Sequence, residues 1–156
     1  MQQRTTPCLW FDRQAEDAAR FYGSVFPNSR IKAITHYGDG MPMPAGTVLT
    51  VAFELDGQDW LALNGGPQFQ FNHAVSFVVN CTTQAEIDHY WERLADGGAV
   101  EQCGWLHDRY GVSWQVVPTQ LAAWMSDPAC SQRVLQAILG MVKLDLAALQ
   151  RAHEGS

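Results

Sequence analysis

Five side chains capable of acid–base or nucleophilic chemistry lie close together in residues 102–118, QCGWLHDRYGVSWQVVP. They are a thiol, an imidazole, a carboxylate, a guanidinium and a phenol, carried by Cys103, His107, Asp108, Arg109 and Tyr110. The same segment also fits a β-hairpin, because Asp108 suits the opening position of a turn and Gly111 suits a positive φ. We therefore interpret residues 107–110 as a solvated hairpin tip and not as a catalytic group.

Side chains alternate between the two faces of a strand, so the hairpin can be sorted by face. On its last strand, one face carries Ser113, Gln115 and Val117. On the strand before it, one face carries Cys103, Trp105 and His107. We place Cys103 in the middle of that strand, either as a small buried hydrophobe or as a reactive thiol.

Helix signals flank this hairpin on both sides. A first helix is predicted after Asp12, an N-cap type residue, and Pro27 ends it. A second opens with the capping box TQAE at Thr83 and Glu86, and residues 96–98, Asp-Gly-Gly, end it.

The C-terminal part of the chain is predicted to be helical as well. Asp127 is the expected cap, with Pro128 at the first helical position. Gly140 interrupts the pattern, and residues 143–153 can form a second short helix.

Strand-like segments lie between the helices, at residues 6–11, 30–38, 47–66, 73–81, 99–106 and 112–118. Within residues 47–66, Asp56-Gly57 is a strong hairpin signal. A strand, a helix and further strands thus occur twice, offset by about 69 residues, which indicates an internal repeat. The predicted fold is α+β: two βαβββ modules whose curled mixed sheets form a cup, plus C-terminal helices.

The predicted organisation is a single domain over residues 1–156. Module one covers about residues 4–66, module two about 72–118, and the C-terminal helices about 127–153. Residues 38–46, rich in Gly, Pro and Met, can act as a lid or as a mobile hairpin tip. Asn72 is expected to fix the turn into the next strand.

Composition excludes several functional classes. The chain of 156 residues is 47% hydrophobic and 17% charged, as expected for a packed globular protein. A net charge of −6 argues against a nucleic-acid partner. No apolar run approaches the length of a bilayer span, and the N-terminus lacks the features of a secretion signal. The four scattered cysteines can make two bridges, but they favour reduced thiols in a cytoplasmic protein.

The sequence resembles the vicinal oxygen chelate superfamily of glyoxalases, bleomycin-resistance proteins and dihydroxybiphenyl dioxygenases. Within it, the chain is most similar to the PhnB-like branch, which is described as demethylubiquinone methyltransferase-like. The resemblance covers residues 5–152 and is carried by TPCLWFDRQAEDAARFYGSVFPNSRI, LDGQDWLALNGGPQFQFNHAVSFVVNC, GGAVEQCGWLHDRYGVSWQVVP and RVLQAILGMVKLDLAALQ. It implies paired βαβββ modules and a homodimer.

The resemblance also implies where a metal would bind. Metal-dependent members of the superfamily carry His, His or Gln, and Glu on the first and last strands of the modules, and leave positions open for substrate oxygens. Those positions fall at about Thr6, Ala74 and Gln115, which do not form a competent ligand set. His73 lies one residue from Ala74, and strand alternation predicts that it points to the opposite sheet face. We therefore expect no metal and no cofactor.

The leading hypothesis is a protein that binds a small organic molecule in an aromatic cup. Its candidate lining residues are Trp10, Asn64, Ser76, Cys103, Trp105 and Gln115. No strand, glycine-rich turn and helix of a typical S-adenosylmethionine site are visible, so we do not expect methyltransferase activity. Two alternatives stay open: a metal-dependent enzyme of the glyoxalase or dioxygenase type that uses His73 and Gln115, and a resistance-type protein that sequesters a drug in a dimer groove.

Overall fold

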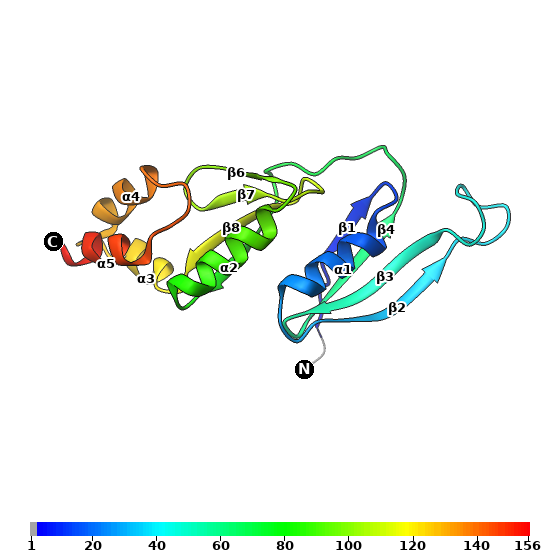
Figure 1. Ribbon diagram of the computed structural model, residues 1–156, viewed down its shortest axis with the longest axis horizontal. Coiled ribbons are helices and arrows are strands. Elements are labelled where there is room, and N and C mark those ends of the chain that lie inside the picture. Colours follow the sequence, from blue (N-terminus) through cyan, green and yellow to red (C-terminus); the bar gives the residue numbers. More distant parts are fainter. Residues whose placement is uncertain (1–2) are drawn as a thin grey trace. The chain divides into compact units, whose positions relative to one another are not determined.

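The computed structural model describes residues 3–156; Met1 and Gln2, which begin the segment expected to lack a secretion signal, lie outside it. The described residues form two compact units, one ending at Gln70 and the other running from Phe71 to Ser156. Each unit contains a four-stranded mixed sheet and a helix, and the second also carries the C-terminal helices (Figure 1). The fold is α+β, as predicted. Within residues 3–156, no helix is long and apolar enough to cross a bilayer.

The first unit is a βαβββ module. Its elements are β1 (Cys8–Phe11), α1 (Ala15–Val25), β2 (Arg30–His36), β3 (Val48–Leu55) and β4 (Gln58–Asn64). The strand order is β1-β4-β3-β2, in which β1 and β4 are parallel and the other neighbours are antiparallel. The predicted turn between β3 and β4 is confirmed: Asp56 and Gly57 have φ values of 48° and 80°, the positive pair that a type I′ hairpin turn requires.

Helix α1 begins later than the sequence predicts. Asp12 is not its N-cap; that position is held by Gln14, whose side chain makes no capping hydrogen bond. Instead, Asn64 Oδ1 accepts a hydrogen bond of 2.9 Å from the backbone N–H of Ala15. Asn64 can take over this capping role because β1 and β4 are parallel neighbours. Their register pairs Phe11 with Asn64 close to the point where the helix starts. A side chain from another strand therefore satisfies the first turn of the helix.

The second unit repeats the topology of the first. Its elements are β5 (Ser76–Cys81), α2 (Gln84–Ala95), β6 (Ala99–Val100), β7 (Trp105–His107) and β8 (Ser113–Pro118). The strand order is β5-β8-β7-β6, with β5 parallel to β8. The capping residue predicted for α2 is confirmed, because Thr83 accepts a hydrogen bond of 3.1 Å from the N–H of Glu86. The Glu86 carboxylate turns to the N–H of Thr82.

The predicted strand position of Cys103 is wrong. Cys103 and Gly104 have φ values of 63° and 83°, so they form the turn between β6 and β7, closed by a 3.1 Å hydrogen bond from Trp105 N to Gln102 O. The N–H groups of Cys103 and Gly104 donate to the carbonyls of Met141 and Val142 at 2.9 and 2.8 Å. The turn is therefore hydrogen-bonded to the loop between the last two helices.

Three C-terminal helices follow β8: α3 (Leu121–Ser126), α4 (Ser131–Leu139) and α5 (Leu146–Glu154). The sequence predicts the last two but misses α3, and Asp127 caps the turn at Ala129 instead of a helix that starts at Pro128. The helices enclose a hydrophobic cluster of buried side chains. Its members are Val117, Trp124, Cys130, Val134, Ile138, Leu144 and Leu149. The short helix α3 exists because Trp124 packs into this cluster.

In each unit the module helix covers one face of the sheet, and in the second unit the C-terminal helices also cover the end of the other face at Val117. In the first unit, Leu9, Phe11, Val51 and Phe53 are buried on the face that α1 covers. In the second, Leu106, Trp114 and Val116 are buried on the face that α2 covers, as the packing of Trp114 beneath a helix predicts. On the face of the second sheet opposite α2, Ser76, Trp105 and Gln115 are half-buried.

Candidate functional site

The register of the second sheet brings most of the predicted site residues to one face. Ser76 pairs with Ser113, and Ser113 pairs with His107 on its other side. In the next row, Val78 pairs with Gln115, and Gln115 pairs with Trp105. We call this surface the open face; it carries Ser76, Val78, Trp105, His107 and Gln115, and also Ser113, which is only 1% exposed. This face lies away from α2, and Val78 at its edge is 50% exposed.

Ser76 and Gln115 form a hydrogen-bonded pair in the middle of the open face. The Gln115 side-chain amide donates from Nε2 to Ser76 Oγ at 2.9 Å. The bond leaves the amide oxygen of Gln115 as an acceptor and the hydroxyl of Ser76 as a donor. The two residues thus offer a ligand one group of each kind, side by side.

Trp105 adds an aromatic surface beside this pair, and His73 lies next to it. The ring centroids of His73 and Trp105 are 6.3 Å apart. The prediction that His73 points to the opposite sheet face is wrong, because His73 precedes β5, where strand alternation does not apply. Asn72 fixes the turn there, as predicted, by accepting a 2.8 Å hydrogen bond from the N–H of Ala74. The turn lets the imidazole reach the face that carries Gln115.

Glu101 is a member of the site that the sequence analysis missed. Its two carboxylate oxygens bind His73 Nε2 at 2.7 Å and His107 Nδ1 at 2.5 Å. Burial acts to raise the pKa of Glu101, but the hydrogen bonds from His107 and His73 outweigh it, so the pKa lies below its usual value. A signal was present: reading Cys103-Gly104 as a hairpin turn places Glu101 opposite Trp105, beside His107.

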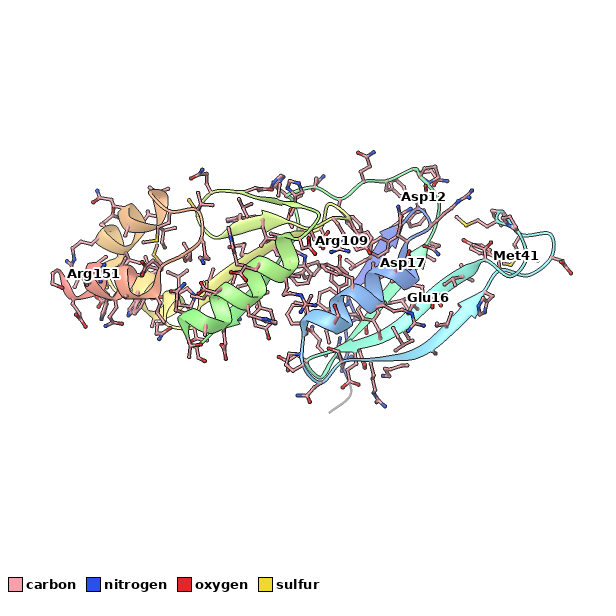
Figure 2. All side chains as sticks on the ribbon, in the orientation of Figure 1. Asp12, Glu16, Asp17, Met41, Arg109 and Arg151 are labelled. Atoms are coloured by element: carbon pink, nitrogen blue, oxygen red, sulfur yellow. The ribbon has the colours of Figure 1, made fainter. Side chains whose placement is uncertain are left out.

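The β7–β8 connection is not the solvated tip that the sequence predicts. Asp108 is 1% exposed, and its carboxylate accepts hydrogen bonds from the N–H groups of Tyr110 and Val112 and from Trp114 Nε1. Arg109 is the exposed member, and its guanidinium pairs with Asp96 at 3.1 Å. Figure 2 labels Arg109 in this connection. The segment is a structural turn held by a buried carboxylate, and Gly111 has the predicted positive φ.

Cys103 lies apart from the open face. Its half-buried side chain packs against the hydrophobic cluster of the C-terminal helices. All four cysteines, which lie within the described residues, are unbridged thiols. Cys103 is placed where a small hydrophobic side chain is needed.

Trp10 and Asn64 belong to the first unit and lie on opposite faces of its sheet. Trp10 Nε1 donates to Gly66 O at 3.0 Å, and its ring meets Phe69 edge-on with centroids 5.0 Å apart. Asn64 is 2% exposed on the α1 side, where it also donates to Val48 O. Its amide is thus engaged in the fold, and Trp10 alone of these two faces away from α1.

The loop predicted as a lid or a hairpin tip also belongs to the first unit. It spans residues 38–46 and joins β2 to β3. Tyr37 N donates to Thr47 O at 2.8 Å and closes its base. Figure 2 labels Met41 in this loop, beyond the ends of the two strands, and the Met41 side chain is 49% exposed. Whether it acts as a lid stays a prediction.

The positions at which the resemblance places metal ligands do not fit a metal ion. Ala74 has no donor atom, Thr6 offers a neutral hydroxyl, and Gln115 is a neutral amide that already binds Ser76. Within residues 3–156, no three side chains of His, Cys, Asp or Glu are arranged to hold a metal ion.

Two hollows in the surface lie away from these residues. One, of about 740 Å³, is bordered by α2, α5 and the loop before α5, and its lining includes Gln84, Asp88 and Lys143. The other lies between α1 and the start of β2, and its lining includes Arg20, Arg30 and Glu54. Lys143 pairs with Asp88 at 2.8 Å and Arg30 with Glu54 at 3.0 Å, while Arg20 pairs with Glu16 at 2.7 Å, so these charged groups already have partners.

Comparison with known proteins now places the chain in a family. The model of the 3-demethylubiquinone-9 3-methyltransferase family matches residues 3–117. The chain belongs to this family. A PhnB protein from Bacillus cereus with the same methyltransferase description is 37% identical; the match covers 74% of this chain and 99% of that one, with a TM-score of 0.69.

More distant structures share the fold of this family. Protein PA1353 from Pseudomonas aeruginosa is 22% identical over 75% of this chain and 98% of its own, with a TM-score of 0.62. The fosfomycin resistance protein FosX from Listeria monocytogenes, in complex with Mn(II) and sulfate, is 13% identical over 81% of this chain and 97% of its own, with a TM-score of 0.56. These likenesses establish the vicinal oxygen chelate fold. No curated protein sequence matches the chain.

Proposed function

We propose that this protein binds a small organic molecule on the open face of its second sheet, without a metal ion. The observation that carries the proposal is the meeting of Ser76, Trp105 and Gln115 on one sheet face that α2 leaves uncovered. A donor, an acceptor and an aromatic ring at adjacent positions are the features of a small-molecule site. The common cup, the homodimer and the cytoplasmic location stay predictions.

The chemistry of the family's ligand positions supports the metal-free part of the proposal. A divalent cation needs charged or strongly donating ligands, and a hydroxyl, a methyl and an amide do not supply them. We expect purified protein to bind Mn²⁺, Ni²⁺, Zn²⁺ or Fe²⁺ no more tightly than millimolar, as measured by titration calorimetry. One equivalent of any of these ions bound with sub-micromolar affinity would refute this part of the proposal.

The family description raises methyl transfer, and the fold does not support it. A typical S-adenosylmethionine site needs a parallel strand, a glycine-rich turn and a helix. Here the turns that lead into α1 and α2 are Asp-Arg-Gln and Thr-Thr, without glycine. We propose that the protein is not a methyltransferase of this type and expect no binding of S-adenosylmethionine in a calorimetric titration.

A fragment screen tests the binding proposal. We expect aromatic fragments with a polar group to shift the NMR signals of the Trp105 indole and of the Gln115 side-chain amide together. The Gln115→Ala substitution should lower the binding affinity of the best fragment by about 5- to 10-fold, because one hydrogen-bond partner is lost. Gln132→Ala is the matched control, since Gln132 is exposed on α4. If fragments bind and leave the Trp105 and Gln115 signals unmoved, the open face is not the site.

A further inference from the structure

Glu101 makes a hydrogen bond to one ring nitrogen of each of two histidines, and the bonded nitrogen differs between the two rings. The bond to His107 is made through Nδ1 and the bond to His73 through Nε2. The three side chains lie beside Trp105, since Glu101 N donates to Trp105 O at 2.9 Å and the His73 ring neighbours the indole. All four residues belong to the second unit. We call His73, Glu101 and His107 the histidine cluster.

The carboxylate determines where a neutral imidazole carries its proton. A carboxylate oxygen only accepts hydrogen bonds, so the nitrogen that faces it must be the N–H. Neutral His107 therefore holds its proton on Nδ1 and presents a lone pair at Nε2. Neutral His73 holds its proton on Nε2 and presents a lone pair at Nδ1. Glu101 thus turns both rings into hydrogen-bond acceptors on their outward nitrogens.

Both outward nitrogens are accessible. Among residues 3–156, no group makes a hydrogen bond to His107 Nε2 or to His73 Nδ1. The side chains are 40% and 65% exposed, whereas that of Glu101 is 24% exposed. Strand pairing places His107 directly opposite Ser113, in the row that also contains Ser76. Ser113 itself is buried, whereas the His73 ring neighbours the half-buried Trp105 indole, so a molecule that lies against Trp105 is placed to meet the histidine cluster.

We propose that the histidine cluster is a hydrogen-bond-accepting subsite, in which Glu101 is a positioning residue and the two imidazoles contact the ligand. This inference rests on the proposed function and names its ligand class: a small, uncharged aromatic molecule with an O–H or N–H donor. The donor meets an imidazole nitrogen, and the ring lies against Trp105. An anionic ligand is disfavoured, because the pKa of Glu101 lies below its ordinary value and its ionised carboxylate repels a negative charge.

The first test requires no ligand. Two-bond ¹H–¹⁵N correlation spectra at pH 8 report which nitrogen of each histidine is protonated. We expect the Nδ1–H tautomer for His107 and the Nε2–H tautomer for His73 in the wild-type protein. The Glu101→Gln variant keeps the size of the side chain but offers an amide that also donates, so the preference should be lost. Glu92→Gln, on the exposed side of α2, is the control. An Nε2–H tautomer for His107 in the wild type overturns the inference.

The second test uses phenol and anisole as probes, which share a ring and differ in the hydroxyl hydrogen. In NMR titrations of the wild type at neutral pH, we expect phenol to bind about 5- to 10-fold more tightly than anisole and to shift the imidazole signals of the histidine cluster. The ratio should fall toward one in Glu101→Gln. Equal affinities, both with shifts at Trp105 and Gln115, refute the subsite and leave the proposed function standing. If neither probe shifts the imidazole signals, the subsite is refuted, and the fragment screen decides the proposed function separately.

Discussion

Asp108 shows at the scale of single residues how one buried carboxylate organises a connection between strands. Its Oδ1 accepts from two backbone N–H groups, at 2.9 and 3.1 Å, and its Oδ2 accepts from Trp114 Nε1 at 2.9 Å. Both oxygens of a carboxylate can accept hydrogen bonds, whereas an asparagine of the same size has one accepting oxygen and an NH₂ group that donates. The turn and the burial of Trp114 beneath α2 therefore depend on the same side chain.

We predict that Asp108→Asn lowers the free energy of unfolding by about 1–3 kcal/mol. The new NH₂ group faces an N–H donor, so at least one buried donor is left unpaired. Urea denaturation monitored by tryptophan fluorescence measures the change. Asp39→Asn, in the exposed β2–β3 loop, is the control and should change stability by less than about 0.5 kcal/mol. Equal stability of the two variants would show that the Asp108 hydrogen bonds contribute nothing.

The second residue-scale prediction concerns pH and Glu101. The pKa of Glu101 lies below its ordinary value of 4.5, so the folded state favours the ionised carboxylate. Its contribution to stability is therefore present above pH 4.5 and is lost as the pH falls through the lowered pKa. We expect Glu101→Gln to be less stable than wild type at pH 7, and the difference to shrink steadily below pH 4.5. Urea denaturation across this pH range checks it; a constant difference contradicts the pKa shift.

How much of the site the sequence could predict depends on where each residue lies. Ser76, Trp105 and Gln115 lie in strands, where alternation predicts which residues of one strand share a face, and the register brings the three to one face. Glu101 was missed and Cys103 misplaced because the backbone reverses at Cys103, a non-glycine residue at positive φ, which sequence patterns rarely predict. Asn64 was predicted to line a cup, but its amide caps a helix through a strand pairing that only the fold defines.

At the scale of elements, the two hairpin turns with positive φ values fix the strands that follow them. The Asp56-Gly57 turn could be recognised from its residues, because Asp-Gly is a common type I′ pair. The Cys103-Gly104 turn shares the conformation but only half of the sequence signal. The starts of the two module helices differ in the same way. The N-cap of α2 at Thr83 could be predicted from the local sequence, whereas the start of α1 depends on Asn64 from another strand.

We predict that Gly104→Ala destabilises the protein by more than Gly40→Ala. Both glycines have positive φ, 83° and 74°, so both substitutions carry a conformational cost of about 1–2 kcal/mol. Only at Gly104 does an added Cβ meet Leu144 at 3.0 Å and the Val116 carbonyl at 3.1 Å; at Gly40 it meets nothing within 4 Å. Thermal or urea unfolding of the two variants separates packing from backbone strain. The same loss in both would mean that the packing at Gly104 relaxes freely.

At the scale of the whole molecule, the chain consists of a pair of modules followed by three helices that lie outside the family match, although the sequence resemblance was expected to extend to residue 152. The family match ends at residue 117, just before α3 begins at Leu121. Repetition of the strand and helix pattern made the two modules predictable. The arrangement of α3, α4 and α5 was harder to predict, because their apolar residues pack against each other and against Val117 and Cys103, which local periodicity does not reveal.

We predict that Leu149→Ala lowers the free energy of unfolding by about 2–5 kcal/mol, because Leu149 is fully buried in the C-terminal cluster and the truncation leaves a cavity. Leu139→Ala is the control, since Leu139 is 61% exposed on the neighbouring helix α4. Urea denaturation measures both. A small effect at Leu149 would indicate that the three helices unfold without the rest of the second unit.

The main-chain bonds from Cys103 and Gly104 to Met141 and Val142 have an evolutionary consequence. The hairpin that presents Trp105, and with it Glu101 and His107, is anchored by a segment that lies outside the family match. Two relatives with identical residues on the sheet can therefore differ in ligand preference if their tails differ. A substitution at Met141 or Val142 is then expected to alter binding on the open face without exchanging any residue that touches the proposed ligand.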